Sequence, residues 1–96
     1  MAAYFLVDTL EVTDREKIEE YKKHVAPLVE KFGGRYLITG GKVEVAEGAW
    51  RPTYPVLIQF PSLEQAHRWY DSEEYRPLKA LRLAATKSNG VFLEGN

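Results

Sequence analysis

The feature that most constrains the fold is an apolar stripe with helical spacing in the first third of the chain. Its residues recur three or four positions apart, which places them on one face of an amphipathic helix: Ile18, Tyr21, Val25, Leu28 and Phe32. Thr13 and Glu16 fit a capping box at the start of this helix, and Gly33-Gly34 ends it. Pro27 lies within the helix, where it removes one backbone hydrogen bond and is expected to bend the helix.

Four segments have the patterns of strands, and they lie at residues 4–12, 35–45, 55–60 and 91–93. The first alternates between apolar and polar residues, as a strand with one solvated face does. In the second, Gly40-Gly41 indicates a bulge or a close approach of two backbones, and Tyr36 and Ile38 are expected on one face. The third is mostly apolar, which predicts an inner strand. Ser88-Asn89-Gly90 is predicted to form a turn before the last strand.

A second helical region follows the third strand. Ser62 and Gln65 fit another capping box, and Asp71-Ser72 breaks or kinks the helix. Pro77 suits the first turn of a renewed helix that runs to about residue 86. The order of elements is therefore β-α-β-β-α-β.

This order predicts an α+β fold, a ferredoxin-like β-α-β-β-α-β sandwich that takes residues 1–96 as one domain. Its four-stranded antiparallel sheet carries both helices on one face. The other face would expose an unusually large apolar patch. Pairing two sheets face to face covers that patch, so we expect a homodimer, a dimeric α+β barrel.

Composition removes several classes of function. The 13 Lys and Arg residues against 14 Asp and Glu argue against a nucleic-acid binder. The absence of cysteine excludes disulfides, thiolate nucleophiles and cysteine-ligated metals. The two histidines, His24 and His67, lack ligand spacing, so we expect neither a metal nor another cofactor. No apolar run reaches the length of about 20 residues that a membrane span needs, and we expect a cytoplasmic protein without membrane contact.

Two charged or titratable residues stand out as candidates for chemistry. His24 lies near the edge of the apolar stripe, where it is either a base beside Tyr21 or a half-exposed boundary residue. Arg82 interrupts an apolar stretch and shares a helix face with Tyr75. Its guanidinium either clamps a substrate carboxylate or enolate, or pairs with a carboxylate of the chain such as Asp8 or Glu94, or extends to solvent.

Aromatic residues mark two further regions. Trp69, Tyr70 and Tyr75 surround the helix break, either as a pocket wall or as core and dimer contact. Trp50 and Arg51 lie on a predicted loop, as a dimer contact or a pocket lid, and the sequence does not choose between these.

Three stretches resemble the family of domains of unknown function numbered 1330: residues 33–41 (GGRYLITGG), 47–52 (EGAWRP) and 60–75, which begin FPSLEQA. The resemblance covers nearly the whole chain. It implies the dimeric α+β barrel superfamily, which includes cofactor-free monooxygenases, small isomerases and dismutase-like haem proteins. It also implies a pocket between the helices and the concave face of the sheet. Thr39 stands where this family commonly has arginine, and Gln59 where it commonly has glutamate.

We therefore expect a small homodimer that binds a compact organic molecule, of the oxo- or hydroxy-acid type, in each protomer. Cofactor-free proton transfer, isomerisation or a monooxygenase-like reaction would rest on His24 as base, Arg82 at a developing oxyanion and Tyr75 as donor. The ligand-binding residues are expected to be Tyr21, Tyr36, Trp69, Tyr70 and Arg51. A non-catalytic dimeric scaffold or sensor is the alternative, and it predicts a filled core. Haem or flavin binding would need a ligating residue, and only His24 offers one.

Overall fold

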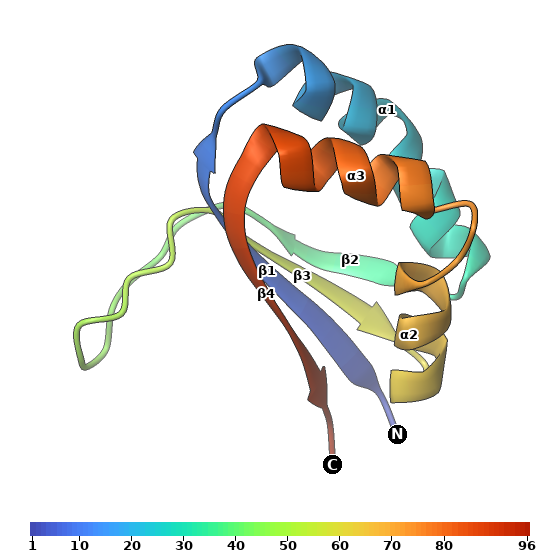
Figure 1. Ribbon diagram of the computed structural model, residues 1–96. Coiled ribbons are helices and arrows are strands. Elements are labelled where there is room, and N and C mark those ends of the chain that lie inside the picture. The colour runs from blue at the N-terminus through green and yellow to red at the C-terminus, as the bar shows by residue number, and fades with distance from the viewer.

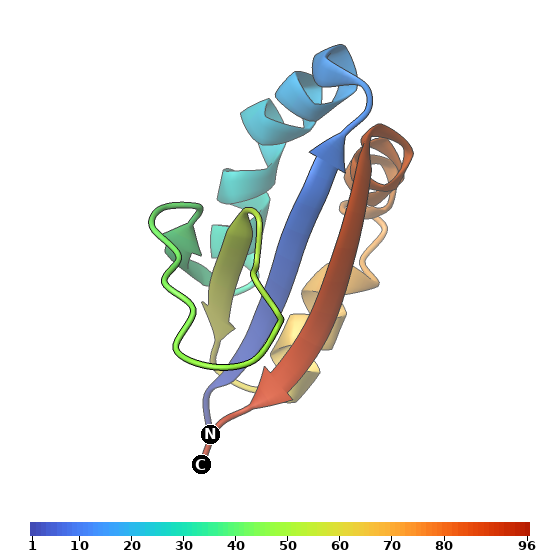
Figure 2. The ribbon, with the colours of Figure 1, turned by 90° about the vertical axis from the view of Figure 1, so that its left-hand side faces the viewer.

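Four strands and three helices build the fold, and the computed structural model describes all of residues 1–96. In chain order they are β1 (Ala3–Val12), α1 (Arg15–Lys31), β2 (Arg35–Thr39), β3 (Pro55–Phe60), α2 (Leu63–Tyr70), α3 (Arg76–Ala85) and β4 (Thr86–Glu94). The strands form one antiparallel sheet in the order β2-β3-β1-β4, and the helices lie on one face of it (Figure 1; Figure 2). This confirms the predicted ferredoxin-like α+β fold and the inner position of β3.

The core lies between the inner face of the sheet and the helices. Tyr36, Ile58, Phe5 and Phe92 are neighbours in one row across the four strands. Trp69 of α2 packs above this row, with its ring centroid 5.6 Å from that of Phe5. Burying one large apolar side chain contributes about 1.5–3 kcal/mol, so this aromatic layer is a main source of stability.

The two capping boxes have different outcomes. Asp14, and not Thr13, caps α1, because its Oδ1 accepts a hydrogen bond from the Lys17 N–H at 3.2 Å. The Thr13 N–H instead donates to the carbonyl of Ala85 at 2.7 Å and ties the start of α1 to the end of α3. Ser62 caps α2 as predicted, accepting from the N–H of residue 65 at 3.1 Å.

Strand β2 is shorter than predicted, since it ends at Thr39 and not at residue 45. A bulge shifts the register between Tyr36 and Ile38, so these two residues face opposite sides of the sheet, against our expectation. The close approach at Gly40 is to a side chain and not to a second backbone, because a Cβ there would clash with the ring of Tyr54. Gly40 also has a φ of +76°, a conformation that favours glycine.

Strand β4 is longer than predicted, because it includes the residues 88–90 that we expected to form a turn. Asn89 pairs with Asp8, and Gly90 pairs with Val7. A Cβ on Gly90 would lie 3.0 Å from the ring of Phe5, so the glycine makes room for that ring. Pairing with β1 outweighs the local turn preference of this segment.

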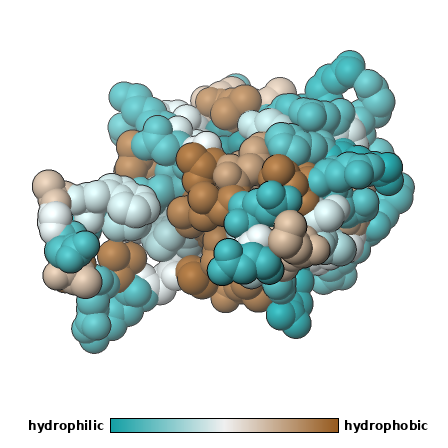
Figure 3. Space-filling view, turned by 90° about the horizontal axis from the view of Figure 1, so that it is seen from below, coloured by the Kyte–Doolittle hydropathy of each residue, from teal (hydrophilic) through white to brown (hydrophobic).

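The outer face of the sheet carries no helix. Four apolar residues form a row across it: Ile38, Leu57, Leu6 and Val91. Figure 3 views the molecule from below the orientation of Figure 1 and shows a central group of apolar side chains. The uncovered apolar face that the sequence predicted is therefore present.

An irregular segment, residues 40–54, connects β2 to β3, and we call it the arm. It projects away from the sheet in Figure 1 and carries Trp50 with 67% of its surface exposed. Its end is anchored by Asp8, whose carboxylate accepts from the backbone N–H groups of Thr53 and Tyr54. None of the three helices combines the length and the apolar character that crossing a membrane requires.

Candidate functional site

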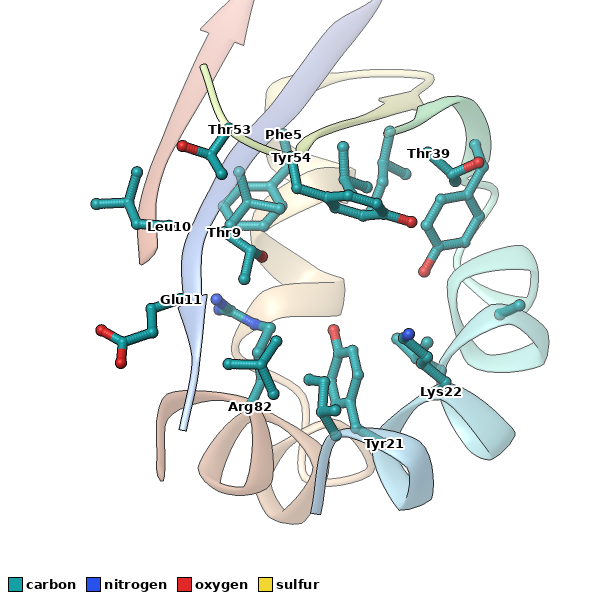
Figure 4. A pocket seen from close by; sticks show the side chains of 18 of the residues that line it. Phe5, Thr9, Leu10, Glu11, Tyr21, Lys22, Thr39, Thr53, Tyr54 and Arg82 are labelled. Atoms are coloured by element: carbon teal, nitrogen blue, oxygen red, sulfur yellow. The ribbon is translucent and has the colours of Figure 1, made fainter. Parts of the chain in front are cut away.

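A cavity of about 550 Å³ lies between α1 and the inner face of the sheet. Its walls are mostly apolar and come from β1, β3, α1 and α2, and they include Val7, Ile18, Val25, Val56 and Trp69. Polar groups enter from several sides, and Figure 4 shows Arg82 and Tyr21 pointing into the same space. An apolar cavity with a few convergent polar groups is the usual form of a small-molecule site.

Arg82 reaches this cavity from α3 and is only 6% exposed. Its Nε donates to the hydroxyl of Tyr75 at 3.4 Å, and its Nη1 donates to Oγ of Ser88 at 3.3 Å. It forms no ion pair with any carboxylate of the chain. The guanidinium is thus a buried charge whose hydrogen-bond partners are neutral hydroxyls, and it also lies over the ring of Phe5, 6.0 Å from the ring centroid.

The carboxylates that could have paired with Arg82 are bound to other groups. Asp8, which we considered as its structural partner, is occupied by Thr53 and Tyr54, with the Tyr54 N–H 2.7 Å from Oδ1. Glu11 lines the rim of the cavity, but its carboxylate points away from it in Figure 4 and lies 3.6 Å from Nζ of Lys87. The charge of Arg82 is therefore left available to a bound molecule.

Two tyrosines extend the polar group around Arg82. The hydroxyls of Tyr21 and Tyr75 lie 2.8 Å apart, which joins α1 to the segment before α3. Burial, together with the neighbouring Tyr75, raises the pKa of Tyr21 above its ordinary value, and burial also raises the pKa of Tyr36. Burial alone would lower the pKa of Arg82, but its interactions with Tyr75 and Tyr21 outweigh burial and raise it. Tyr21 and Tyr36 therefore remain neutral near pH 7, and the guanidinium of Arg82 remains charged.

His24 lies outside this cavity. Its side chain is 57% exposed on the flank of α1, and its Nε2 lies 3.3 Å from Oε1 of Glu20. Tyr21 and Val25 belong to the apolar stripe and face the cavity. His24 lies one residue before Val25, and neighbouring residues of a helix point in different directions, so His24 faces solvent. We therefore withdraw His24 as the base for a molecule held in the cavity.

The other expected site residues divide into two groups. Tyr36 and Trp69 line the cavity, and Tyr75 stands behind it through its bonds to Tyr21 and Arg82. Tyr70 instead packs in the core, with its ring 5.4 Å from that of Phe5. Arg51 lies exposed on the arm.

Sequence reasoning missed several lining residues. Thr9 could have been found, because strand alternation places it on the same side as Phe5 and Val7. No pattern in the sequence pointed to Lys22 or Tyr54, because Lys22 borders the apolar stripe and Tyr54 lies at the end of the arm. Thr39 also lines the cavity, at the position where the family resemblance led us to expect arginine.

The fold and the cavity define an α+β sandwich protein with a pocket of small-molecule size between helices and sheet. The sequence matches the family described as Domain of unknown function (DUF1330) over residues 2–96, and the chain belongs to this family, as its motifs predicted. No curated protein matches the sequence.

Several solved structures share the fold. RPA0582, a protein of unknown function from Rhodopseudomonas palustris, is 17% identical with a TM-score of 0.76, covering 99% of this chain and 82% of that one. SnoaB, a cofactor-independent oxygenase from Streptomyces nogalater, is 11% identical with a TM-score of 0.64, covering 99% and 92%. A putative antibiotic biosynthesis monooxygenase from Nitrosomonas europaea is 13% identical with a TM-score of 0.55, covering 98% and 89%. At these identities the similarity shows the fold alone.

Proposed function

We propose that this protein binds a compact organic molecule of the oxo- or hydroxy-acid type in the cavity, with Arg82 as the anchor. The observation that carries the proposal is the buried guanidinium that lines the cavity and pairs with no carboxylate. A buried charge without a counter-charge is costly, and an anionic oxygen of a ligand would compensate that cost. The apolar walls would cover the body of the same molecule.

The same arrangement suits a reaction in which negative charge develops on an enolate oxygen. A fixed guanidinium in a mostly apolar cavity stabilises such a charge, as in proton transfer, isomerisation or cofactor-free oxygenation. SnoaB, which shares the fold, is named a cofactor-independent oxygenase, and extending such a reaction to this chain rests on analogy of fold together with the position of Arg82.

A non-catalytic scaffold or sensor is the competing proposal. It predicted that the aromatic residues fill the core and leave no cavity. The cavity of about 550 Å³ between α1 and the sheet therefore favours ligand binding.

Titration with small acids tests the proposed function. Trp69 lines the cavity, so its fluorescence reports on occupancy, and Trp50→Phe removes the signal of the exposed tryptophan. Mandelate, phenylpyruvate and benzoate are suitable probes. Because hydrogen bonds to charged groups contribute about 1.5–3 kcal/mol, we expect Arg82→Gln to lower the affinity for these acids by about ten- to hundredfold.

A matched control uses an arginine away from the cavity. Arg68 on α2 is exposed and pairs with Glu64, so Arg68→Gln should leave acid binding unchanged. Equal affinity of the acids for the wild type and for Arg82→Gln would contradict the assignment of the site, and so would a wild type that binds none of the three acids.

The proposal also includes a homodimer formed through the outer faces of two sheets. The apolar row of Ile38, Leu57, Leu6 and Val91 supports it, because monomers seldom expose patches of this kind. A second copy offers the same row, and self-complementary faces of this kind close around a twofold axis.

Analytical ultracentrifugation tests the dimer. The wild type should sediment at twice the mass of the chain, and Val91→Lys, which places a charge in the apolar row, should give the single chain mass. Leu83→Lys is the control, since Leu83 is an apolar residue of comparable exposure on α3, within the helical layer. A monomeric wild type, or a dimer that survives Val91→Lys, would count against this interface.

A further inference from the structure

A chain of three side chains connects α1 with α3, and its hydrogen bonds have a fixed direction. Arginine has donors but no acceptor, so the 3.4 Å contact between Arg82 and Tyr75 runs from Nε–H to the phenolic oxygen. Tyr75 is therefore the acceptor at this contact. Its own proton remains to be placed.

The proton of Tyr75 has one acceptor within reach. The side chain is 0% exposed, and beyond Arg82 its hydroxyl contacts only the hydroxyl of Tyr21, at 2.8 Å. If Tyr21 donated across this contact, the Tyr75 proton would be buried without an acceptor, and a buried unsatisfied donor bears its full desolvation penalty. Tyr75 therefore donates and Tyr21 accepts.

This direction leaves the proton of Tyr21 unused within the chain. Tyr21 lines the cavity, and its hydroxyl points into it in Figure 4. No hydrogen bond occupies the Nη2 group of Arg82, and the side chain of Arg82 also lines this cavity and points into it in Figure 4. Burial raises the pKa of Tyr21, which keeps its hydroxyl a donor at neutral pH. Two donors from different helices thus converge.

On the basis of the proposed ligand site, we infer that Tyr21 is the second hydrogen-bond donor of this site. Tyr75 is a positioning residue that holds Tyr21 in this role. Together, Arg82 and Tyr21 select a ligand group that has acceptors only. A carboxylate or an enolate accepts from Arg82 and Tyr21 at once. A primary amide of the same shape places its NH2 group, which is itself a donor, opposite Arg82 or Tyr21, where it cannot accept a hydrogen bond. The cavity therefore favours the ionised acid over its amide.

Benzoate and benzamide form the probe pair that tests this inference, because they share their shape and differ in acceptors. The measurements use the Trp50→Phe chain as reference, with Tyr21→Phe, Tyr75→Phe and the double variant added to it. We expect the reference to prefer benzoate by at least about tenfold, the loss typical of one unmatched charged hydrogen bond. Tyr21→Phe should lower that preference to about threefold or less, with benzamide affinity little changed.

Tyr75→Phe tests the positioning role, because a purely structural role of Tyr75 would leave the preference for benzoate over benzamide unchanged. Tyr75 lies behind the cavity wall, yet its removal frees Tyr21 to turn or to donate elsewhere, so the preference for benzoate should fall. The double variant should be no less selective than Tyr21→Phe alone, because Tyr75 acts through Tyr21. Losses of selectivity that add in the double variant would overturn the positioning role, as would an unchanged preference in Tyr75→Phe.

Comparison with Arg82→Gln separates this inference from the proposed function. If Arg82→Gln lost benzoate binding while Tyr21→Phe kept the full preference for benzoate, the assignment of the site would stand, but Tyr21 would not be its second donor. A reference chain that binds neither benzoate, mandelate nor phenylpyruvate would overturn both. Phenylalanine keeps the ring of each tyrosine, and unchanged urea midpoints would show that the variants are folded.

Discussion

Replacing Asp8 by alanine is expected to destabilise the protein by removing the anchor of the arm. Asp8 lies on β1 with 5% of its surface exposed. Its Oδ1 accepts from the N–H groups of Tyr54 at 2.7 Å and Thr53 at 2.9 Å, and its Oδ2 lies 3.1 Å from the same Thr53 nitrogen. These bonds fix the backbone where the arm rejoins β3.

The magnitude follows from the number of donors and from their burial. A hydrogen bond to a charged acceptor contributes about 1.5–3 kcal/mol, and Asp8→Ala leaves two N–H groups without this acceptor. Because these contacts are only part-buried, water recovers some of the loss, and we expect about 2–4 kcal/mol in the free energy of unfolding. Asp8→Asn keeps one acceptor oxygen without its charge, so it should lose about 1–2 kcal/mol.

Urea unfolding followed by circular dichroism measures both variants. The midpoint should fall in the order wild type, Asp8→Asn, Asp8→Ala, with little change in the slope m. Asp71→Ala is the control, because this exposed carboxylate has only a 4.0 Å contact with Lys79 and should change stability by less than about 0.5 kcal/mol. A loss below about 0.5 kcal/mol in Asp8→Ala would refute the reasoning that this carboxylate holds the arm.

Three further predictions concern stability. Gly34→Ala should lower the thermal midpoint, because its Cβ would lie 2.6 Å from Cγ1 of Val29 and 2.7 Å from the ring of Phe60, and overpacking of this kind costs about 1–3 kcal/mol. Ser62→Ala removes the cap of α2 and should cost about 1 kcal/mol by urea unfolding; an unchanged midpoint would show that the cap contributes nothing. Because Tyr21 has a pKa raised above 10.0 in the folded state, the unfolded chain binds fewer protons above that pH, and stability should fall there as pH rises. Urea midpoints at about pH 8 and about pH 11 should therefore differ more in the wild type than in Tyr21→Phe.

Local patterns predicted the elements whose signals lie within a few neighbouring residues. The apolar stripe of α1, the Ser62 cap of α2 and the break before α3 were all readable, because a helix of the right period and a capping hydroxyl need no distant partner. The predictions at Thr13 and at residues 88–90 were wrong because distant backbone decided them. Thr13 donates to Ala85, and the segment 88–90 pairs with β1.

The sequence indicated which residue types could form a site better than it indicated which side chains face the cavity. Arg82 stood out because a charge within an apolar stretch must find an acceptor or reach solvent. His24 stood out on chemical grounds, yet one position along α1 separates the exposed flank from the buried stripe, and the packing of that helix turned it outward.

The sequence by itself determined the order of the elements, the apolar sides of helix and sheet, and the presence of an arginine within an apolar stretch, since these depend on local periodicity and charge. Only the tertiary structure decided which groups meet Arg82. Asp8 binds the end of the arm, and Tyr75 and Tyr21 come together from positions 54 residues apart. Tyr36 faces the cavity because it pairs with Ile58, while the bulge that follows it places Ile38 on the opposite side. Such meetings depend on the register of distant strands and on helix packing, which no local pattern encodes. They leave the guanidinium with neutral hydroxyls instead of a carboxylate.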